Sequence, residues 1–138
     1  MQKKEFVNRI HELISMDLGI DGVEILYRSK DYFCAEYVSA HFNPLSYRIY
    51  INEDWLKCAD VTEIIRVVAH EMRHAYQKFQ IDFPDLISKK HDKSEVEIWE
   101  KEFAQYINPA SDLYVYNQQA IEKDAVLYSE KLIIETFK

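Results

Sequence analysis

The segment from Asp60 to Phe79 constrains the fold of this chain more than any other part of it. Its apolar residues recur with the i, i+3, i+4, i+7 spacing of one helix face. Asp60 or Thr62 can cap the start of such a helix, and Glu63 follows Asp60 by three residues, as in a capping box. We therefore predict an amphipathic helix continuing to about Phe79, with one apolar stripe facing the core. The stripe consists of Val61, Ile64, Ile65, Val68, Met72, Ala75, Tyr76 and Phe79.

The residues before this helix predict another helix and a small sheet. Residues 3–18 have apolar positions at helical spacing and are followed by a glycine, which is typical of a helix end. Val23 to Tyr27 is a short strand candidate. Tyr32 to His41 and Tyr47 to Asn52 are rich in β-branched and aromatic residues, and the turn-forming stretch at 43–46 separates them, so we expect a hairpin.

The remainder of the chain predicts two further helices after a polar loop at 87–93. One fits Ser94 to Tyr106 and is stopped by Asn108 and Pro109, because a residue before proline is disfavoured in the helical region. The last runs from about Tyr116 to Phe137. We therefore predict an α+β fold, with a small, mainly antiparallel sheet of about three strands packed on helices, and one domain covering residues 1–138.

Composition narrows the classes of protein that this chain can belong to. The net charge of −7 and the lack of a basic stripe argue against nucleic-acid binding. No apolar run reaches the length of a membrane span, and the N-terminus lacks the apolar segment of a signal peptide. Cys34 and Cys58 form neither a metal-type pair nor a disulfide framework. We expect a cytoplasmic location.

The predicted helix carries the motif His70-Glu71-Met72-Arg73-His74. Residues four apart lie on one helix face with β-carbons about 5–6 Å apart, so both imidazoles can bind one zinc ion. Glu71 stands beside this pair, where a general base that acts on metal-bound water must lie. The two histidines lie almost opposite the apolar stripe, so we expect them to face away from the core.

A catalytic zinc ion usually has three protein ligands, and the motif supplies two. Glu122 is the strongest candidate for the third, because it lies on a separate helix whose face can pack against the metal helix. Asp124, about 200° around the same helix, and the loop residue His91 are the alternatives. Weaker rivals are Glu95, Glu97 and Asp112. Tyr106, Tyr114 and Tyr116 are candidates for stabilising an oxyanion.

Together these residues resemble a known group of enzymes. His70-Glu71-x-x-His74, followed by Glu122-x-x-Ala125 on a C-terminal helix, looks like the zincin metallopeptidases of gluzincin type. The small ImmA/IrrE-like, SprT-like and minimal gluzincin proteins of bacteria and phages are the most similar in size. The resemblance implies His70, His74 and Glu122 as zinc ligands and Glu71 as the general base. Val126 stands where several gluzincins have an aspartate that supports a histidine.

We therefore expect a zinc metallopeptidase with one Zn²⁺ per chain and a peptide or protein substrate. Metal-bound water, activated by Glu71, would attack the peptide carbonyl. The hairpin between Tyr32 and Asn52 could present an edge strand to an extended substrate. The alternative is a zincin-fold binding or regulatory protein that holds metal without turnover. A purely structural zinc site fits less well, because such sites favour thiolates and neither cysteine is near the histidines.

Overall fold

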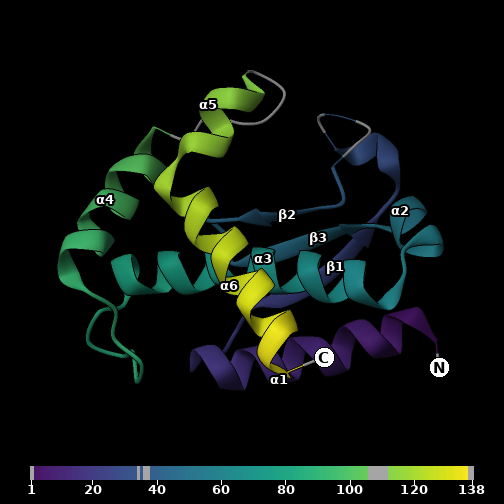
Figure 1. Ribbon diagram of the computed structural model, residues 1–138, viewed down its shortest axis with the longest axis horizontal. Helices are drawn as coiled ribbons and strands as arrows, with labels where there is room; N and C mark the ends of the chain where they lie inside the picture. The colour runs from purple at the N-terminus through teal and green to yellow at the C-terminus, as the bar shows by residue number, and fades with distance from the viewer. Residues whose placement is uncertain (1, 34, 36–37, 106–111, 137–138) are drawn as a thin grey trace.

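The computed structural model describes residues 2–33, 35, 38–105 and 112–136, and has an α+β fold. In Figure 1 the longest helix, α3 (Val61–Asp82), crosses the middle of the molecule, with α1 (Lys3–Leu18) below it. The C-terminal helix α6 (Ala120–Thr136) crosses α3, and α4 (Lys93–Ala104) packs on both. The central position of α3 confirms that its amphipathic pattern organises the core.

The sheet is mixed, with strand order β1-β3-β2. The hairpin of β2 (Ala40–Asn43) and β3 (Arg48–Asn52) is antiparallel, as expected. β1 (Glu24–Arg28), however, pairs in parallel with β3, so the prediction of a mainly antiparallel sheet is wrong. A parallel neighbour requires a connection that crosses from one edge to the other, and strand propensity alone does not show this.

The first strand of the hairpin is shorter than its residue types indicate. Lys30–Tyr32 forms a short 3₁₀ helix, η1, and β2 begins only at Ala40, so the expected strand from Tyr32 is wrong at its start. The ring of Tyr32 packs against Tyr50 and Phe33, with centroids 5.1 and 5.5 Å apart. The aromatic residues at the start of this segment, which we interpreted as a sign of a strand, therefore serve to pack against one another and against β3.

The cap predicted at Asp60 is confirmed, because its Oδ1 accepts a 2.8 Å hydrogen bond from the Glu63 amide. Gly19 ends α1 in the left-handed conformation (φ 68°), and its amide donates to the Ser15 carbonyl. A Cβ on Gly19 would lie 2.6 Å from the Ser88 hydroxyl, so both backbone and space favour glycine here. These ends fix the lengths of the two helices that build the core.

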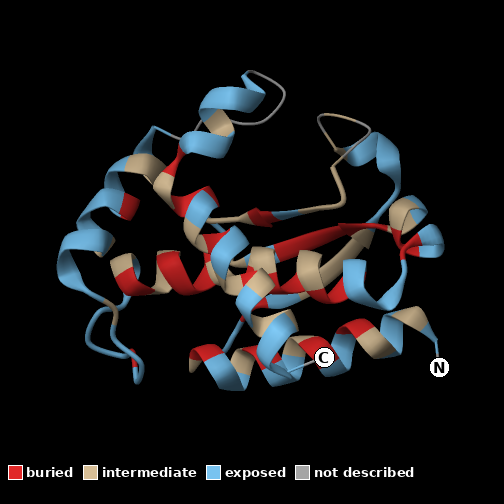
Figure 2. Cartoon of the chain, viewed as in Figure 1, coloured by how far each residue is buried: buried red, intermediate tan, exposed pale blue. Residues whose placement is uncertain are grey.

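Buried residues concentrate along α3 and β3 (Figure 2). The predicted stripe of α3 is buried except at its ends, where Val61 is 57% exposed and Phe79 is half-buried. The long C-terminal helix is broken: α5 (Leu113–Gln118) ends before Gln119, and α6 starts anew at Ala120. The expectation of one helix from Tyr116 was therefore wrong, and the break places Glu122 in a first helical turn.

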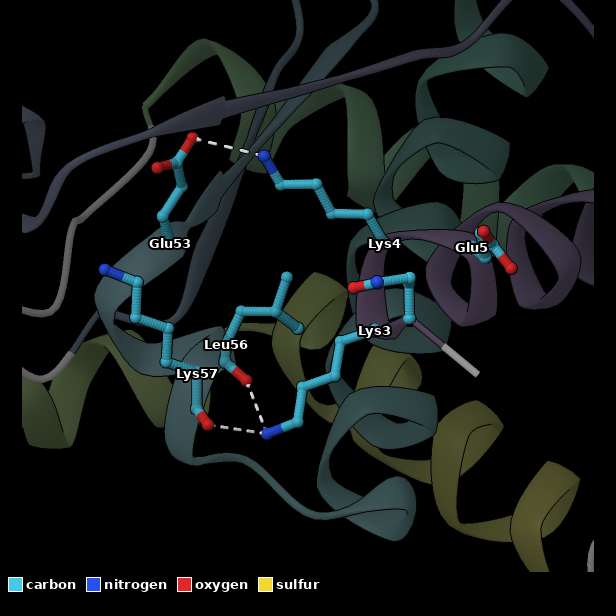
Figure 3. A pocket seen from close by; sticks show the side chains of 7 residues that line it. Lys3, Lys4, Glu5, Glu53, Leu56 and Lys57 are labelled. Atoms are coloured by element: carbon cyan, nitrogen blue, oxygen red, sulfur yellow. Dashed lines mark hydrogen bonds and ion pairs between the residues drawn. The ribbon is translucent and has the colours of Figure 1, made fainter.

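A short helix missed by the sequence analysis, α2 (Glu53–Cys58), follows β3 directly. The Asn52 side chain caps its start by accepting from the amides of Asp54 and Trp55. Lys3 binds its end, with Nζ 3.0 and 2.7 Å from the carbonyls of Leu56 and Lys57 (Figure 3). Its Nζ also lies 2.9 Å from the Ala59 carbonyl. The surface hollow drawn there contains none of the candidate site residues. No helix within the described ranges combines the length and apolar character needed to cross a membrane.

Candidate metal centre

The two motif histidines and Glu122 meet between α3 and α6. His70 Nε2 lies 3.0 Å from Glu122 Oε1, and His74 Nε2 lies 3.1 Å from Oε2 of the same carboxylate. Their rings are edge to face, with centroids 4.8 Å apart. Two residues one helical turn apart and a third about fifty positions later are therefore brought to one point by the packing of α6 on α3.

This meeting point is more buried than the sequence indicated. His74 is 6% exposed and Glu122 only 2%, whereas His70 is half-buried. The expectation that the histidines face away from the core is wrong for His74, because α6 covers that face of α3. A charged carboxylate so deeply buried requires partners, and the two imidazoles supply them.

Burial and charge oppose each other in the titration of this pair. Burial lowers the pKa of His74, but the Glu122 carboxylate, with smaller contributions from Glu71 and Gln77, raises it to about 9. Burial likewise raises the pKa of Glu122, whereas His74 and His70 hold it well below its usual range. In the metal-free protein at neutral pH, both ring nitrogens of His74 are therefore protonated, and the Glu122 carboxylate stabilises the resulting positive charge.

The residue between the histidines points to the sheet. Glu71 Oε1 accepts a 2.7 Å hydrogen bond from the backbone amide of Phe42 on β2. The ligand-type atoms of His70, Glu71 and His74 all lie within 4.8 Å of one another, so these three residues form a group that could hold a metal ion. Glu71 is thus next to the imidazoles but is held from the opposite side by an edge strand.

The tautomer of His74 indicates whether these residues are suited to bind zinc. Its Nδ1 lies 3.0 Å from Gln77 Oε1, an amide oxygen that can only accept, so Nδ1 carries a proton. In a neutral ring Nε2 then has a lone pair directed at the Glu122 carboxylate, which is unfavourable unless a proton or a cation lies between them. Two imidazole nitrogens and one carboxylate are ligands that zinc accepts, so these residues fit the ion.

The two alternative third ligands are engaged elsewhere. Both oxygens of Asp124 accept from the guanidinium of Arg73, at 2.7 and 3.2 Å, and one also accepts from Gln77. His91 Nε2 lies 2.6 Å from Glu95 in α4, and its ring packs against Trp99. Of the three candidates proposed from the sequence, Glu122 is the one that both histidines contact.

Of the three tyrosine candidates for stabilising an oxyanion, the structure describes Tyr114 and Tyr116. Tyr114 is 74% exposed on α5, and Tyr116 lies on the same short helix. Tyr106 lies outside the described residues, as does Cys34, while Cys58 is exposed. Asp112, a weaker rival for the metal, accepts from the Val115 amide at the start of α5. The oxyanion role therefore stays a prediction.

Comparison of the chain with protein-family models, curated proteins and solved structures gave no match. The function of the chain is therefore inferred from the geometry of the site.

Two contributors to the site were missed in the sequence. Gln77 is fully buried and contacts His74, and Phe42 contributes only its backbone amide. Gln77 has a recognisable signal, since it follows His74 by three residues and therefore lies on the same helix face. A backbone donor has no residue-type signal at all.

Proposed function

We propose that the chain is a zinc-dependent peptidase in which His70, His74 and Glu122 bind the metal and Glu71 is the general base. The observation that carries the proposal is the contact of both Nε2 atoms with the two oxygens of one buried carboxylate, at 3.0 and 3.1 Å. This arrangement also matches the ligand set implied by the resemblance to gluzincins. The three ligands come from two helices packed together, which favours a preformed site.

A zinc ion bound there would supply a Lewis acid and lower the pKa of water towards neutrality. Glu71 would take the proton of the attacking water and pass it to the leaving amine. Two ion pairs, Arg66–Glu130 and Arg73–Asp124, join α3 and α6, and the less exposed Arg73–Asp124 pair helps to hold the two ligand-bearing helices in place. Catalysis would thus depend on a rigid interface between helices.

The edge strand β2 is where we propose that an extended peptide binds. β2 pairs with β3 on one side, and within the part of the chain that the structure describes no strand pairs with its other side. The Phe42 amide is directed away from β3, so the main chain of Ala40, two residues earlier, is directed to the same side. A substrate could add to this side by main-chain hydrogen bonds.

The decisive experiment is metal analysis of the wild type beside His74→Ala and Glu122→Ala. The matched control is Lys123→Ala, at an exposed position of the same helix as Glu122, and Asp124→Ala tests the alternative ligand. We expect about one zinc per chain in the wild type and in the control, and weakened binding in the two ligand variants. Zinc retained by Glu122→Ala and lost by Asp124→Ala would contradict the ligand assignment.

Turnover is tested separately, by incubating the zinc-loaded protein with an unfolded test protein and detecting fragments. We expect cleavage that a chelator abolishes and added zinc restores. Stoichiometric zinc without cleavage of unfolded proteins would instead support the alternative, a metal-holding binding or regulatory protein.

A further inference from the structure

Gln77 connects the two helices that carry the candidate ligands. Its side chain is fully buried, and its Oε1 lies 3.0 Å from His74 Nδ1. Its Nε2 donates to the carbonyl of Ile121 at 3.0 Å and to Asp124 Oδ2 at 2.8 Å. One amide therefore contacts a candidate ligand on α3 and the residue immediately before the candidate ligand Glu122 on α6.

The partners of this amide determine which way it points. The Ile121 carbonyl and the Asp124 carboxylate can only accept, so the NH₂ group of Gln77 must face them and its oxygen must face His74. The His74 ring must then donate from Nδ1, which directs the lone pair of neutral Nε2 towards Glu122. The polarity of Gln77 thus selects the tautomer that a metal ligand needs.

Asp124 is itself held in position. Arg73 donates to both of its oxygens, and the Arg73 guanidinium lies over the rings of Tyr76 and Tyr128, at 4.3 and 5.0 Å from their centroids. The chain of contacts therefore runs from a clamped guanidinium, through a carboxylate and an amide, to the imidazole. Each group in it has a fixed orientation.

We propose that Gln77 is a positioning residue of the metal centre, which orients His74 and fixes the start of α6 relative to it. The inference rests on the proposed zinc site. It also explains why a fully buried helical position has an amide, since an apolar side chain of similar length would avoid the cost of burying polar atoms.

The test compares the zinc affinities of Gln77→Met and Gln80→Met with that of the wild type. Each affinity is measured by competition with a chromophoric chelator. Gln80 is a matched control, because it is buried on the same helix. Its amide bonds the Lys89 carbonyl and the backbone amide of His91 and makes no contact with the two histidines of the motif. We expect zinc affinity to fall about 10–100-fold in Gln77→Met and to change less than threefold in Gln80→Met.

A second readout separates positioning from loss of folding. In the zinc-loaded wild type, we expect the Nδ1 proton of His74 to be visible by NMR and protected from exchange, and in Gln77→Met to exchange at least tenfold faster. Thermal unfolding is recorded for both variants, so that a general loss of structure is recognised. Equal zinc affinity in Gln77→Met and wild type, or equal losses in both variants, would overturn the proposal.

A charge-matched swap tests the polarity argument. Gln77→Glu keeps an acceptor for His74 but turns an oxygen towards the Asp124 carboxylate, so zinc affinity should fall at least tenfold. Adding Asp124→Asn removes one of the two neighbouring negative charges and restores the net charge of the wild type, and we expect the double variant to recover at least part of the loss. A wild type that binds no zinc would instead reject the proposed function, and the inference with it.

Discussion

The backbone amide of Phe42 donates a 2.7 Å hydrogen bond to the side chain of Glu71. This bond joins the edge strand of the sheet to the residue that stands between the two histidines of α3. Because the donor is a main-chain group, its position follows from the pairing of β2 with β3 and not from the residue type at position 42. The orientation of the Glu71 carboxylate is therefore set by the sheet.

The first prediction concerns the chemistry of Glu71. In Glu71→Gln, the amide oxygen can still accept from Phe42, but the side chain can no longer take a proton. We expect zinc content to stay at the wild-type level and peptidase turnover to fall about 10²–10⁴-fold. The measurements are elemental analysis and the rate of fragment formation.

Glu71→Ala is the matched control, because it also removes the acceptor for the Phe42 amide. It should lose turnover to the same extent and in addition lose about 1 kcal/mol of unfolding free energy. Turnover that persists in Glu71→Gln would exclude this residue as the base.

The second prediction compares two ion pairs between α3 and α6. The side chains of Arg73 and Asp124 are 13% and 20% exposed, whereas those of Arg66 and Glu130 are 43% and 44% exposed. Asp124→Ala leaves a largely buried guanidinium without its acceptor, and we expect it to cost about 1.5–3 kcal/mol.

Glu130→Ala should cost only about 0–1 kcal/mol, because the Arg66 pair is exposed and screened by solvent. Denaturant unfolding of both variants beside the wild type measures the difference. Equal costs would show that the Arg73–Asp124 pair contributes no more than a surface contact.

The third prediction concerns pH. The pKa of His74 is raised to about 9 in the metal-free protein, so at lower pH a proton occupies the nitrogen that zinc requires. The proton must leave before zinc binds, and apparent zinc affinity should therefore rise about tenfold per pH unit up to about pH 9 and level off above it. Chelator competition between pH 6 and 10 measures the slope.

Glu122→Gln supplies the control for this pH dependence. Without the carboxylate, burial dominates and the pKa of His74 falls, so the rise in affinity should end at a lower pH even though binding is weaker throughout. An affinity that does not change with pH in the wild type would contradict the protonated state of His74.

The fourth prediction concerns the start of α6. Glu102 of α4 accepts from the amides of Ala120 and Ile121, at 2.9 and 2.8 Å, and so satisfies two donors at that helix end. Glu102→Ala should cost about 1 kcal/mol of stability and weaken zinc binding several-fold, because the first turn of α6 carries Glu122. Glu100→Ala, at an exposed position of the same helix, should change neither quantity in the same melting and chelator assays.

Much of the site could be predicted because helical spacing is local. The convergence of His70 and His74 follows from their four-residue separation, and the choice of Glu122 followed from a predicted helix face that could pack against α3. Gln77 was missed because an amide beside an apolar stripe has no obvious role until its partners are known. Phe42 could not be found, since a backbone donor depends on strand register.

The fold was predicted best where capping residues mark an element's ends. Asp60 and Gly19 defined the two core helices, and the turn at 43–46 defined the hairpin. The parallel pairing of β1 with β3 was missed because it joins residues distant in sequence. The break at Gln119, where the backbone is extended (ψ 138°), was missed because neither glycine nor proline marks it.

That break also determines how the chain can tolerate changes in length. The carbonyl of Gln119 accepts from the amides of Glu122 and Lys123. The position of the Glu122 carboxylate therefore depends on its spacing from Gln119 and not on the length of α5. A residue inserted within α5 leaves the spacing from Gln119 to Glu122 unchanged, whereas one inserted after Ala120 rotates Glu122 by about 100° around the helix. Insertions and deletions should therefore be tolerated within α5 and be disruptive in the three positions that follow Gln119.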